Sequence, residues 1–209
     1  MRVLLTAFDP FGKEKINPAL EVCKKVKIDH ENVELFKLEI PTVFNKSVKK
    51  VVGKIEEIKP DLIFLLGQAG GRSKVSLERI AINIDNASIK DNEGNMPKNL
   101  KQRENGPDGI FSSLDIEDLV FELKKEGIPA EISNSAGTFV CNHLMYGTLL
   151  YIKENKLDIK GVFIHLPFLP EQVLDKGNLP YMPLEMMIRA IEIIINKQID
   201  LCWEGNNND

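Results

Sequence analysis

The sequence predicts an α/β protein: a single-domain, three-layer α/β/α sandwich around a twisted, open and mostly parallel sheet. Short apolar runs alternate with amphipathic stretches along the chain, and this alternation is typical of a parallel sheet covered by helices on both faces. The 209 residues suit one domain with a sizeable core. Hydrophobic residues at 43% and charged residues at 28% give the balance of a soluble globular protein.

The N-terminal part alternates between strand and helix. Residues 2–8 form a nearly continuous apolar run, which predicts a buried strand. Asn17 and Pro18 then open a helix that ends near residue 25, since proline is favoured at the first helical position. Residues 33–40 alternate with period two, as in a half-buried strand. Residues 43–58 place valine and isoleucine at helical spacing, with Lys and Glu on the other face.

The middle of the chain continues with strands and a long irregular segment. Residues 61–66 predict a second buried strand, which ends in a glycine cluster at 67–71. The cluster matches neither GxxxxGK[ST] nor GxGxxG, so we expect no bound phosphate and no cofactor there. A further strand is expected at 77–86. Residues 86–112 show no strong period and predict a long surface excursion.

The C-terminal part returns to the same alternation. Helices are expected at 114–126, 138–155 and about 183–197, a strand is expected at 161–166, and residues 128–132 lead into another strand. No repeat or linker divides residues 1–209, which favours a single domain. The polar end at about 204–209 is expected to be a flexible tail.

Charge and hydropathy argue against several kinds of partner. The formal net charge is -4 and no basic face is implied, so we expect no nucleic acid partner. No segment approaches the ~18 consecutive apolar residues of a membrane span. The first residues lack a signal-peptide pattern and predict the first strand instead.

Cysteine usage predicts a reducing, cytoplasmic location. The three cysteines, Cys23, Cys141 and Cys202, lie far apart in the sequence and form no CxxC pair. A structural zinc site is therefore not expected, and no other metal is implied. Cys202 is expected to be free or to cross-link two subunits, and the residues alone do not decide between these alternatives.

Cys141 is the residue with the clearest chemical potential. It follows a polar turn at the start of an expected helix, for which Thr138 is the predicted N-cap. In the first helical turn, the helix dipole and free N–H groups favour an anion, so we expect the thiol to ionise more readily. A thiolate there would be the nucleophile of a cysteine hydrolase. The alternative is a buried cysteine with a structural role.

A thiol nucleophile needs a base, and the chain has three histidines. His30 lies in a polar turn. His143 follows Cys141 by two residues, and on a helix such side chains point about 200° apart, so a structural role is expected. His165 ends a strand before a proline-stiffened turn and is the better base.

A carboxylate should hold the imidazole of His165 in one tautomer. Glu78 and Glu171 both qualify by position, and spacing does not choose between them. Phe8, Gln68 and His165 each lie at or just after the end of an expected strand. Because open α/β sheets bind ligands beyond the carboxyl ends of their strands, we expect these three side chains to converge.

Four segments in order resemble the pyroglutamyl peptidase I family. They are TAFDPFGKEKINP (6–18), GQAGGRSKVSLERIAINI (67–84), SNSAGTFVCNH (133–143) and GVFIHLPFLPEQV (161–173). The resemblance covers nearly the whole chain. It implies a cysteine peptidase that removes N-terminal pyroglutamate from peptides through a thioester acyl-enzyme. It also implies an open α/β/α sandwich and a homo-oligomer, a tetramer or a dimer.

The resemblance also assigns roles to individual residues. It implies that Cys141 is the nucleophile, that His165 is the general base and acid, and that Glu78 rather than Glu171 orients His165. The residues implied for substrate binding are Phe8, Phe11 and Phe139 as aromatic walls, Gln68 as a polar contact to the lactam, and Asn17, which either orients Gln68 or only starts the helix at Pro18.

The chain departs from the family pattern after Ile84. Ser88 stands where the family has an arginine, and Lys90 stands where it has a proline. We therefore expect reduced turnover or a shifted pH optimum unless Lys90 or Arg79 supplies the missing charge. This departure keeps two alternatives open: a non-catalytic protein that binds lactam-ended peptides, and a cysteine amidase for a related small amide.

Overall fold

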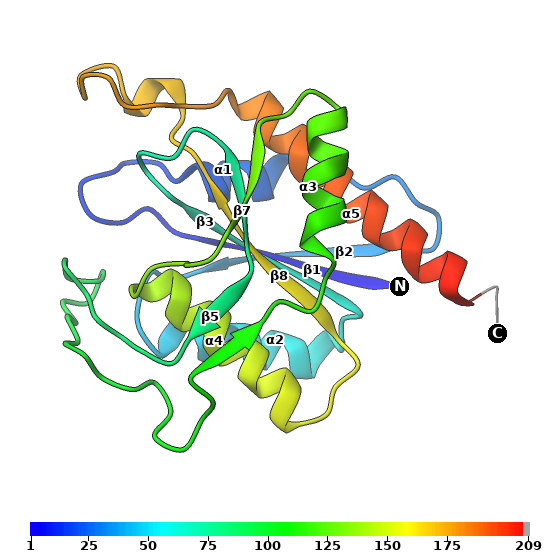
Figure 1. Ribbon diagram of the computed structural model, residues 1–209, viewed down its shortest axis with the longest axis horizontal. Coiled ribbons are helices and arrows are strands. Elements are labelled where there is room, and N and C mark those ends of the chain that lie inside the picture. Colours follow the sequence, from blue (N-terminus) through cyan, green and yellow to red (C-terminus); the bar gives the residue numbers. More distant parts are fainter. Residues whose placement is uncertain (207–209) are drawn as a thin grey trace.

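The computed structural model describes the backbone of residues 1–206 and the side chains of residues 1–203. Its main sheet has six strands in the order β2-β1-β3-β8-β4-β7 (Figure 1). These strands are β1 (Arg2–Phe8), β2 (Glu34–Ile40), β3 (Leu62–Gln68), β4 (Val75–Glu78), β7 (Ala130–Ser133) and β8 (Lys160–Leu166). Neighbouring strands are parallel except β4 and β8, which are antiparallel. The predicted mostly parallel sheet is confirmed.

Helices cover both faces of this sheet, as predicted for a three-layer sandwich. One layer contains α1 (Pro18–Lys25), α3 (Ile116–Lys125) and α5 (Leu184–Asn206), and the other contains α2 (Lys46–Ile58) and α4 (Val140–Glu154) (Figure 1). Each layer packs its apolar side on the sheet and forms its own hydrophobic cluster. Within the described residues, no helix combines the length and apolar character that a membrane crossing requires.

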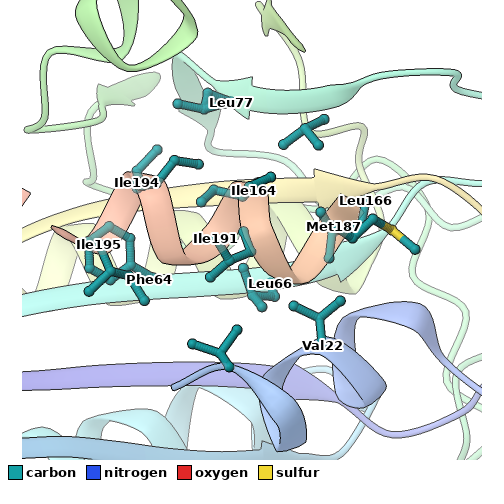
Figure 2. Packing of buried hydrophobic residues seen from close by; sticks show 14 of the residues in the cluster. Val22, Phe64, Leu66, Leu77, Ile164, Leu166, Met187, Ile191, Ile194 and Ile195 are labelled. Atoms are coloured by element: carbon teal, nitrogen blue, oxygen red, sulfur yellow. The ribbon is translucent and has the colours of Figure 1, made fainter. Parts of the chain in front are cut away.

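The core holds the two central strands in place. Ile191, Ile194 and Ile195 of α5 pack with side chains of β3 and β8, among them Phe64 and Ile164 (Figure 2). All five side chains are completely buried. Each burial of this kind stabilises the fold by about 1.5–3 kcal/mol. The carboxyl ends of β3 and β8, which carry Gln68 and His165, are thereby attached to a rigid support.

The local signals for helix starts are correct at α1 and wrong at α4. Asn17 caps α1, because its Oδ1 accepts a hydrogen bond from Ala19 N at 3.0 Å. Helix α4 begins at Val140 with Phe139 as N-cap, and no side chain bonds to its first amides. The predicted N-cap Thr138 instead donates its hydroxyl hydrogen to Asn86 O at 2.7 Å. Because the Thr138 hydroxyl bonds to the loop after residue 85, it does not cap α4.

The strand predicted at 77–86 is two shorter strands in different sheets. β4 ends at Glu78, and β5 (Ile80–Ile82) pairs with β6 (Gly109–Phe111) in a separate antiparallel pair. The backbone N–H and C=O of Ile82 bond to the side chain of Asn142 on α4, which draws this segment away from the main sheet. Strand β6 lies in the segment for which the sequence showed no period.

The last helix continues beyond its predicted end near residue 197. Helix α5 includes the backbone of residues 198–206, so residues 204–206 of the predicted tail are helical. The remaining residues of that tail, 207–209, lie outside the part of the chain that the structure describes.

Candidate active site

Cys141 lies at the carboxyl edge of the sheet, against the strand position next to His165. His165, near the end of β8, pairs in register with Gly67 of β3. A Cβ atom added to Gly67 would lie 3.2 Å from Cys141 Sγ and 2.7 Å from the ring of Phe163. The thiol therefore rests against the strand position beside His165, where only glycine leaves it enough room.

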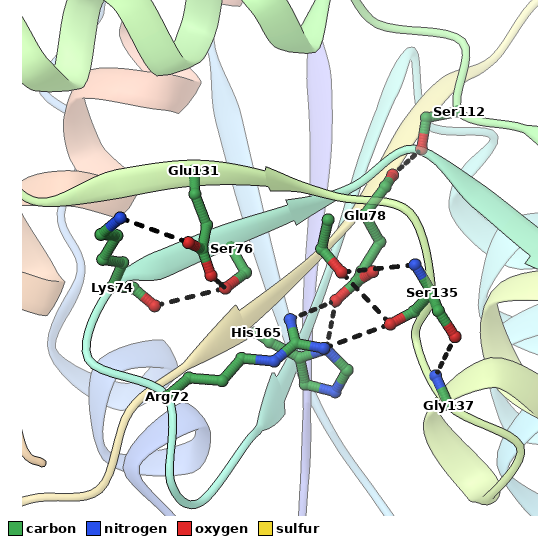
Figure 3. A network of polar contacts seen from close by, with 10 residues as sticks. Arg72, Lys74, Ser76, Glu78, Ser112, Glu131, Ser135, Gly137 and His165 are labelled. Atoms are coloured by element: carbon green, nitrogen blue, oxygen red, sulfur yellow. Dashed lines mark hydrogen bonds and ion pairs between the residues drawn. The ribbon is translucent and has the colours of Figure 1, made fainter.

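Glu78 holds the imidazole of His165. Strand β4 runs antiparallel to β8, and this pairing brings Glu78 Oε1 to 2.7 Å from His165 Nδ1 (Figure 3). Both side chains are buried, with 0% of Glu78 and 5% of His165 exposed. A carboxylate on Nδ1 fixes the tautomer with hydrogen on Nδ1 and leaves Nε2 free to accept a proton. Glu171 lies in a short 3-10 helix and is exposed, so the structure brings Glu78, not Glu171, to His165.

Arg72 joins this pair, although sequence reasoning missed it. Its Nη1 is 2.7 Å from Glu78 Oε1, and its Nη2 donates to Ser135 O at 3.1 Å (Figure 3). The available signal was an arginine directly after the glycines that follow β3. The loop that contains the glycine cluster thus places the positive charge of Arg72 next to Glu78.

The pKa of the Cys141 thiol differs from the prediction. Burial raises the pKa of the Cys141 thiol to about 12, with a further rise from the Glu78 carboxylate and a smaller opposing effect of Arg72. The expectation that this thiol ionises more readily is therefore wrong, because desolvation and the Glu78 carboxylate both raise its pKa. For Glu78, burial alone would raise the pKa. The hydrogen bond and charge of His165, with the charge of Arg72, bring this pKa below its ordinary value.

The predicted aromatic residues gather at the same edge, with two additional phenylalanines. The Phe11 and Phe139 rings are 6.1 Å apart, and Phe44 meets Phe139 edge-on at 5.5 Å. Phe8 is only 1% exposed and packs at 6.5 Å from Phe163, so it lies beneath the surface. Phe44 and Phe163 were missed, because their roles depend on contacts between segments far apart in the sequence.

Gln68 is oriented by Gln172 rather than by Asn17. Gln172 Nε2 donates to Gln68 Oε1 at 2.9 Å. The side chain of Asn17 caps α1 and donates to Asp9 O at 3.1 Å, and it therefore supports the loop that leads to Phe11. Of the two roles considered for Asn17, the structure shows the helix start.

His143 has the structural role predicted for it. It is buried, its Nδ1 is 2.9 Å from Asp85 Oδ2, and its Nε2 accepts a hydrogen bond from Asn45 N at 2.9 Å. Its ring also packs edge-on against Phe44, with the centroids 5.2 Å apart. His143 thus anchors the loop before α2, which carries one of the aromatic residues.

Of the two expected substitutes for the missing arginine, Arg79 has another partner. Ser88 and Lys90 are exposed, and Arg79 pairs with the exposed Glu117 at 3.2 Å. Among the described residues, no group of three or more His, Cys, Asp or Glu side chains could hold a metal ion. The reactive groups that the structure shows at this edge are a thiol, an imidazole and a carboxylate.

The fold and this site define a class: a cysteine hydrolase on an α/β/α sandwich, with an imidazole held by a glutamate. The sequence model of the pyroglutamyl peptidase family matches residues 1–200. The chain belongs to the pyroglutamyl peptidase family.

Individual relatives agree with this assignment. Pyrrolidone-carboxylate peptidase 1 of Caldanaerobacter subterraneus is 53% identical over 195 residues, which are 93% of this chain and 96% of the relative. The pyrrolidone-carboxylate peptidase of Brachyspira hyodysenteriae is 50% identical over 199 residues, 95% of this chain and 99% of the relative.

Solved structures show the same fold. Pyroglutamyl peptidase I of Bacillus amyloliquefaciens superimposes with a TM-score of 0.88 at 43% identity, covering 92% of each chain. Pyrrolidone carboxyl peptidase of Pyrococcus furiosus gives 0.92 at 38% identity, covering 96% of this chain and 99% of that one.

Proposed function

We propose that Cys141, His165 and Glu78 carry out the reaction of this cysteine peptidase, the removal of pyroglutamate from the N-terminus of peptides. The observation that carries this proposal is the 2.7 Å contact between Glu78 and His165, beside a thiol that rests against Gly67. Neither the binding protein nor the amidase considered above is favoured by an observation of its own. Ser88, which motivated the first, is exposed.

The raised pKa of Cys141 shapes the first step. Because burial keeps the resting thiol protonated, His165 Nε2 removes its proton as Sγ attacks the pyroglutamyl carbonyl. The imidazolium that forms is stabilised by Glu78, whose pKa lies below its ordinary value. The raised pKa of the thiol favours general-base catalysis over a preformed thiolate.

The start of α4 supplies the oxyanion site. Phe139 cannot cap the helix with its side chain, so the first amides of α4 remain without a side-chain partner among the described residues. Those N–H groups stabilise the negative oxygen of the tetrahedral intermediate. His165 then protonates the leaving amine. Water activated by the same imidazole hydrolyses the thioester and frees pyroglutamate.

The aromatic residues select the lactam. Phe11 and Phe139, supported by Phe44 and by Phe8 beneath, bury the ring methylenes, each worth about 0.8 kcal/mol. Gln68, held by Gln172, bonds the polar edge of the lactam. An ordinary N-terminus would bring an unpaired ammonium ion into this apolar site, and its desolvation cost excludes such peptides.

Assembly and location follow from the family resemblance. We propose a homo-oligomer, a dimer or a tetramer, and a cytoplasmic location. Leu174, Leu179 and Tyr181, exposed on the segment before α5, support the first proposal, since grouped apolar side chains are typical of subunit contacts. The three unpaired cysteines support the second. Light scattering after size-exclusion chromatography would measure the oligomer size.

The function is tested by release of a fluorescent amine from a pyroglutamyl amide. We expect release by the reduced wild-type protein and loss of at least about a thousandfold in Cys141→Ser, because the alkoxide nucleophile is far harder to form. Prolyl and glutaminyl amides are the specificity controls and should remain intact. Equal cleavage of the prolyl amide would contradict the lactam selection, and an active Cys141→Ser would contradict the nucleophile.

A further inference from the structure

Arg72 contacts the site from a loop that the sequence analysis linked to no function. The loop between β3 and β4 carries Gly70 and Gly71 before it. A Cβ atom on Gly70 would lie 2.2 Å from the ring of Phe168, and Gly71 has a φ of +89°, so both positions require glycine. These glycines let the loop turn closely over Phe168, and the turn places the Arg72 side chain over Glu78.

Glu78 needs a cation at this position. Its side chain is 0% exposed, and its Oε2 is buried with no hydrogen-bond partner among the described residues. A fully buried carboxylate costs several kcal/mol unless it is paired. His165 and Arg72 both contact the same Oε1, and the arginine guanidinium stays charged throughout the working pH range.

Arg72 also joins the carboxylate to the segment that precedes the nucleophile. Its second nitrogen bonds Ser135 O, in the turn that leads into α4 and Cys141. One planar guanidinium therefore contacts both the carboxylate that holds the general base and the turn before the nucleophile's helix, which a point charge such as lysine could not do equally well. Arg79, the neighbour of Glu78 in sequence, points away toward Glu117.

We propose that Arg72 is a positioning residue of the peptidase: it holds the Glu78 carboxylate against His165 and ties it to the turn before Cys141. This inference rests on the function proposed above for Cys141, His165 and Glu78.

The proposal predicts a specific change in the pH dependence of activity when Arg72 is replaced. The titratable or charged groups around Glu78 are His165 on β8, Arg72 on its loop and Cys141 on α4. Arg72 lowers the pKa of the Glu78 carboxyl and of the Cys141 thiol. Without its charge, Glu78 takes up a proton at higher pH and stops accepting the Nδ1 hydrogen. The acid limb of activity then moves to higher pH.

The test compares Arg72→Gln, Arg72→Lys and the matched control Arg79→Gln. We measure kcat/KM from about pH 5 to 9, a range in which folded proteins are usually stable. Thermal melting of each variant checks that it is folded. Arg72→Gln should lose about 10- to 100-fold in kcat/KM, as expected for one charge-assisted hydrogen bond, and its acid limb should shift upward. Arg72→Lys should restore the limb but only part of the rate. Arg79→Gln should match the wild type.

A second readout does not depend on the peptidase substrate. The rate of alkylation of Cys141 by iodoacetamide, followed by mass spectrometry in a Cys202→Ser background, should fall in Arg72→Gln at each pH. Unchanged alkylation together with an unshifted acid limb would overturn the proposal for Arg72. Wild-type protein that is alkylated with the expected Arg72 dependence but releases no amine would overturn the proposed function instead.

Discussion

At the scale of single residues, Gly67 gives the Cys141 thiol room to pack against the strand position next to His165. Its position is shared by the ring of Phe163 and the sulfur of Cys141, which would lie 2.7 and 3.2 Å from an added Cβ. Protein interiors are close-packed, so even one methyl group must displace a neighbour. One of these neighbours, Phe163, has its ring 4.8 Å from that of His165.

We therefore expect Gly67→Ala to lower kcat/KM by about a hundredfold, since a shift of about 1 Å of a reacting group has that effect. Gly53→Ala is the matched control, because nothing lies within 4 Å of its Cβ and the residue is exposed on α2. The control should keep full activity and gain about 0.5–1 kcal/mol of stability. Wild-type kcat/KM in Gly67→Ala would show that the close approach is not required.

At the scale of elements, helix starts serve two purposes. Asp115 accepts hydrogen bonds from Glu117 N and Asp118 N at 3.1 Å and so satisfies the first amides of α3. Helix α4 has no such cap, and the proposed mechanism uses its free amides for the oxyanion. A helix start without a polar cap lowers the stability of the helix. In α4, the burial of most of its side chains offsets this loss.

Substitutions at the two helix starts should differ accordingly. Asp115→Ala should lower the free energy of unfolding by about 1 kcal/mol, the usual cost of a lost N-cap. Thr138→Ala loses a single exposed bond to Asn86 O and should stay within about 0.5 kcal/mol of the wild type. Urea unfolding measures both. An equal loss in the two variants would mean that Thr138 acts as a cap after all.

At the scale of the whole molecule, buried carboxylates hold segments that lie far apart in the sequence. Asp91 accepts hydrogen bonds from the backbone N–H groups of Phe44, Glu93 and Asn95. It thereby connects the long segment after β5 to the loop before α2. Burial alone would raise the pKa of Asp91, but these hydrogen bonds bring it below its ordinary value.

Acid should therefore destabilise the protein in a definite direction. A carboxyl whose folded pKa is below its unfolded pKa of 3.8 contributes full stability above that value and loses it as pH falls through the folded pKa. The free energy of unfolding of the wild type should thus decrease below about pH 4. Asp91→Asn should be less stable at pH 7 and show a smaller decrease, whereas the exposed Glu104→Gln should follow the wild type. Urea titrations from pH 7 to 3 would measure the slopes, and a slope unchanged in Asp91→Asn would contradict this role.

The sequence by itself determined most elements and indicated the residues that we propose to react. Apolar periodicity and caps such as Asn17 depend on residues a few positions apart, so the strands β1 and β8 and the helix α1 were predicted closely. The segments around Cys141, Glu78 and His165 carried the resemblance to the family whose model matches residues 1–200.

Only the tertiary structure decided how these residues act together. The pairing of β3 with β8 and of β8 with β4 sets Gly67, His165 and Glu78 side by side, and strand register is a long-range property. Desolvation of Cys141, which makes its thiol a weak acid, depends on everything packed around it. Arg72 was missed for the same reason. Its contact with Glu78 depends on how the glycine-containing loop between β3 and β4 folds, and spacing along the chain does not reveal that conformation.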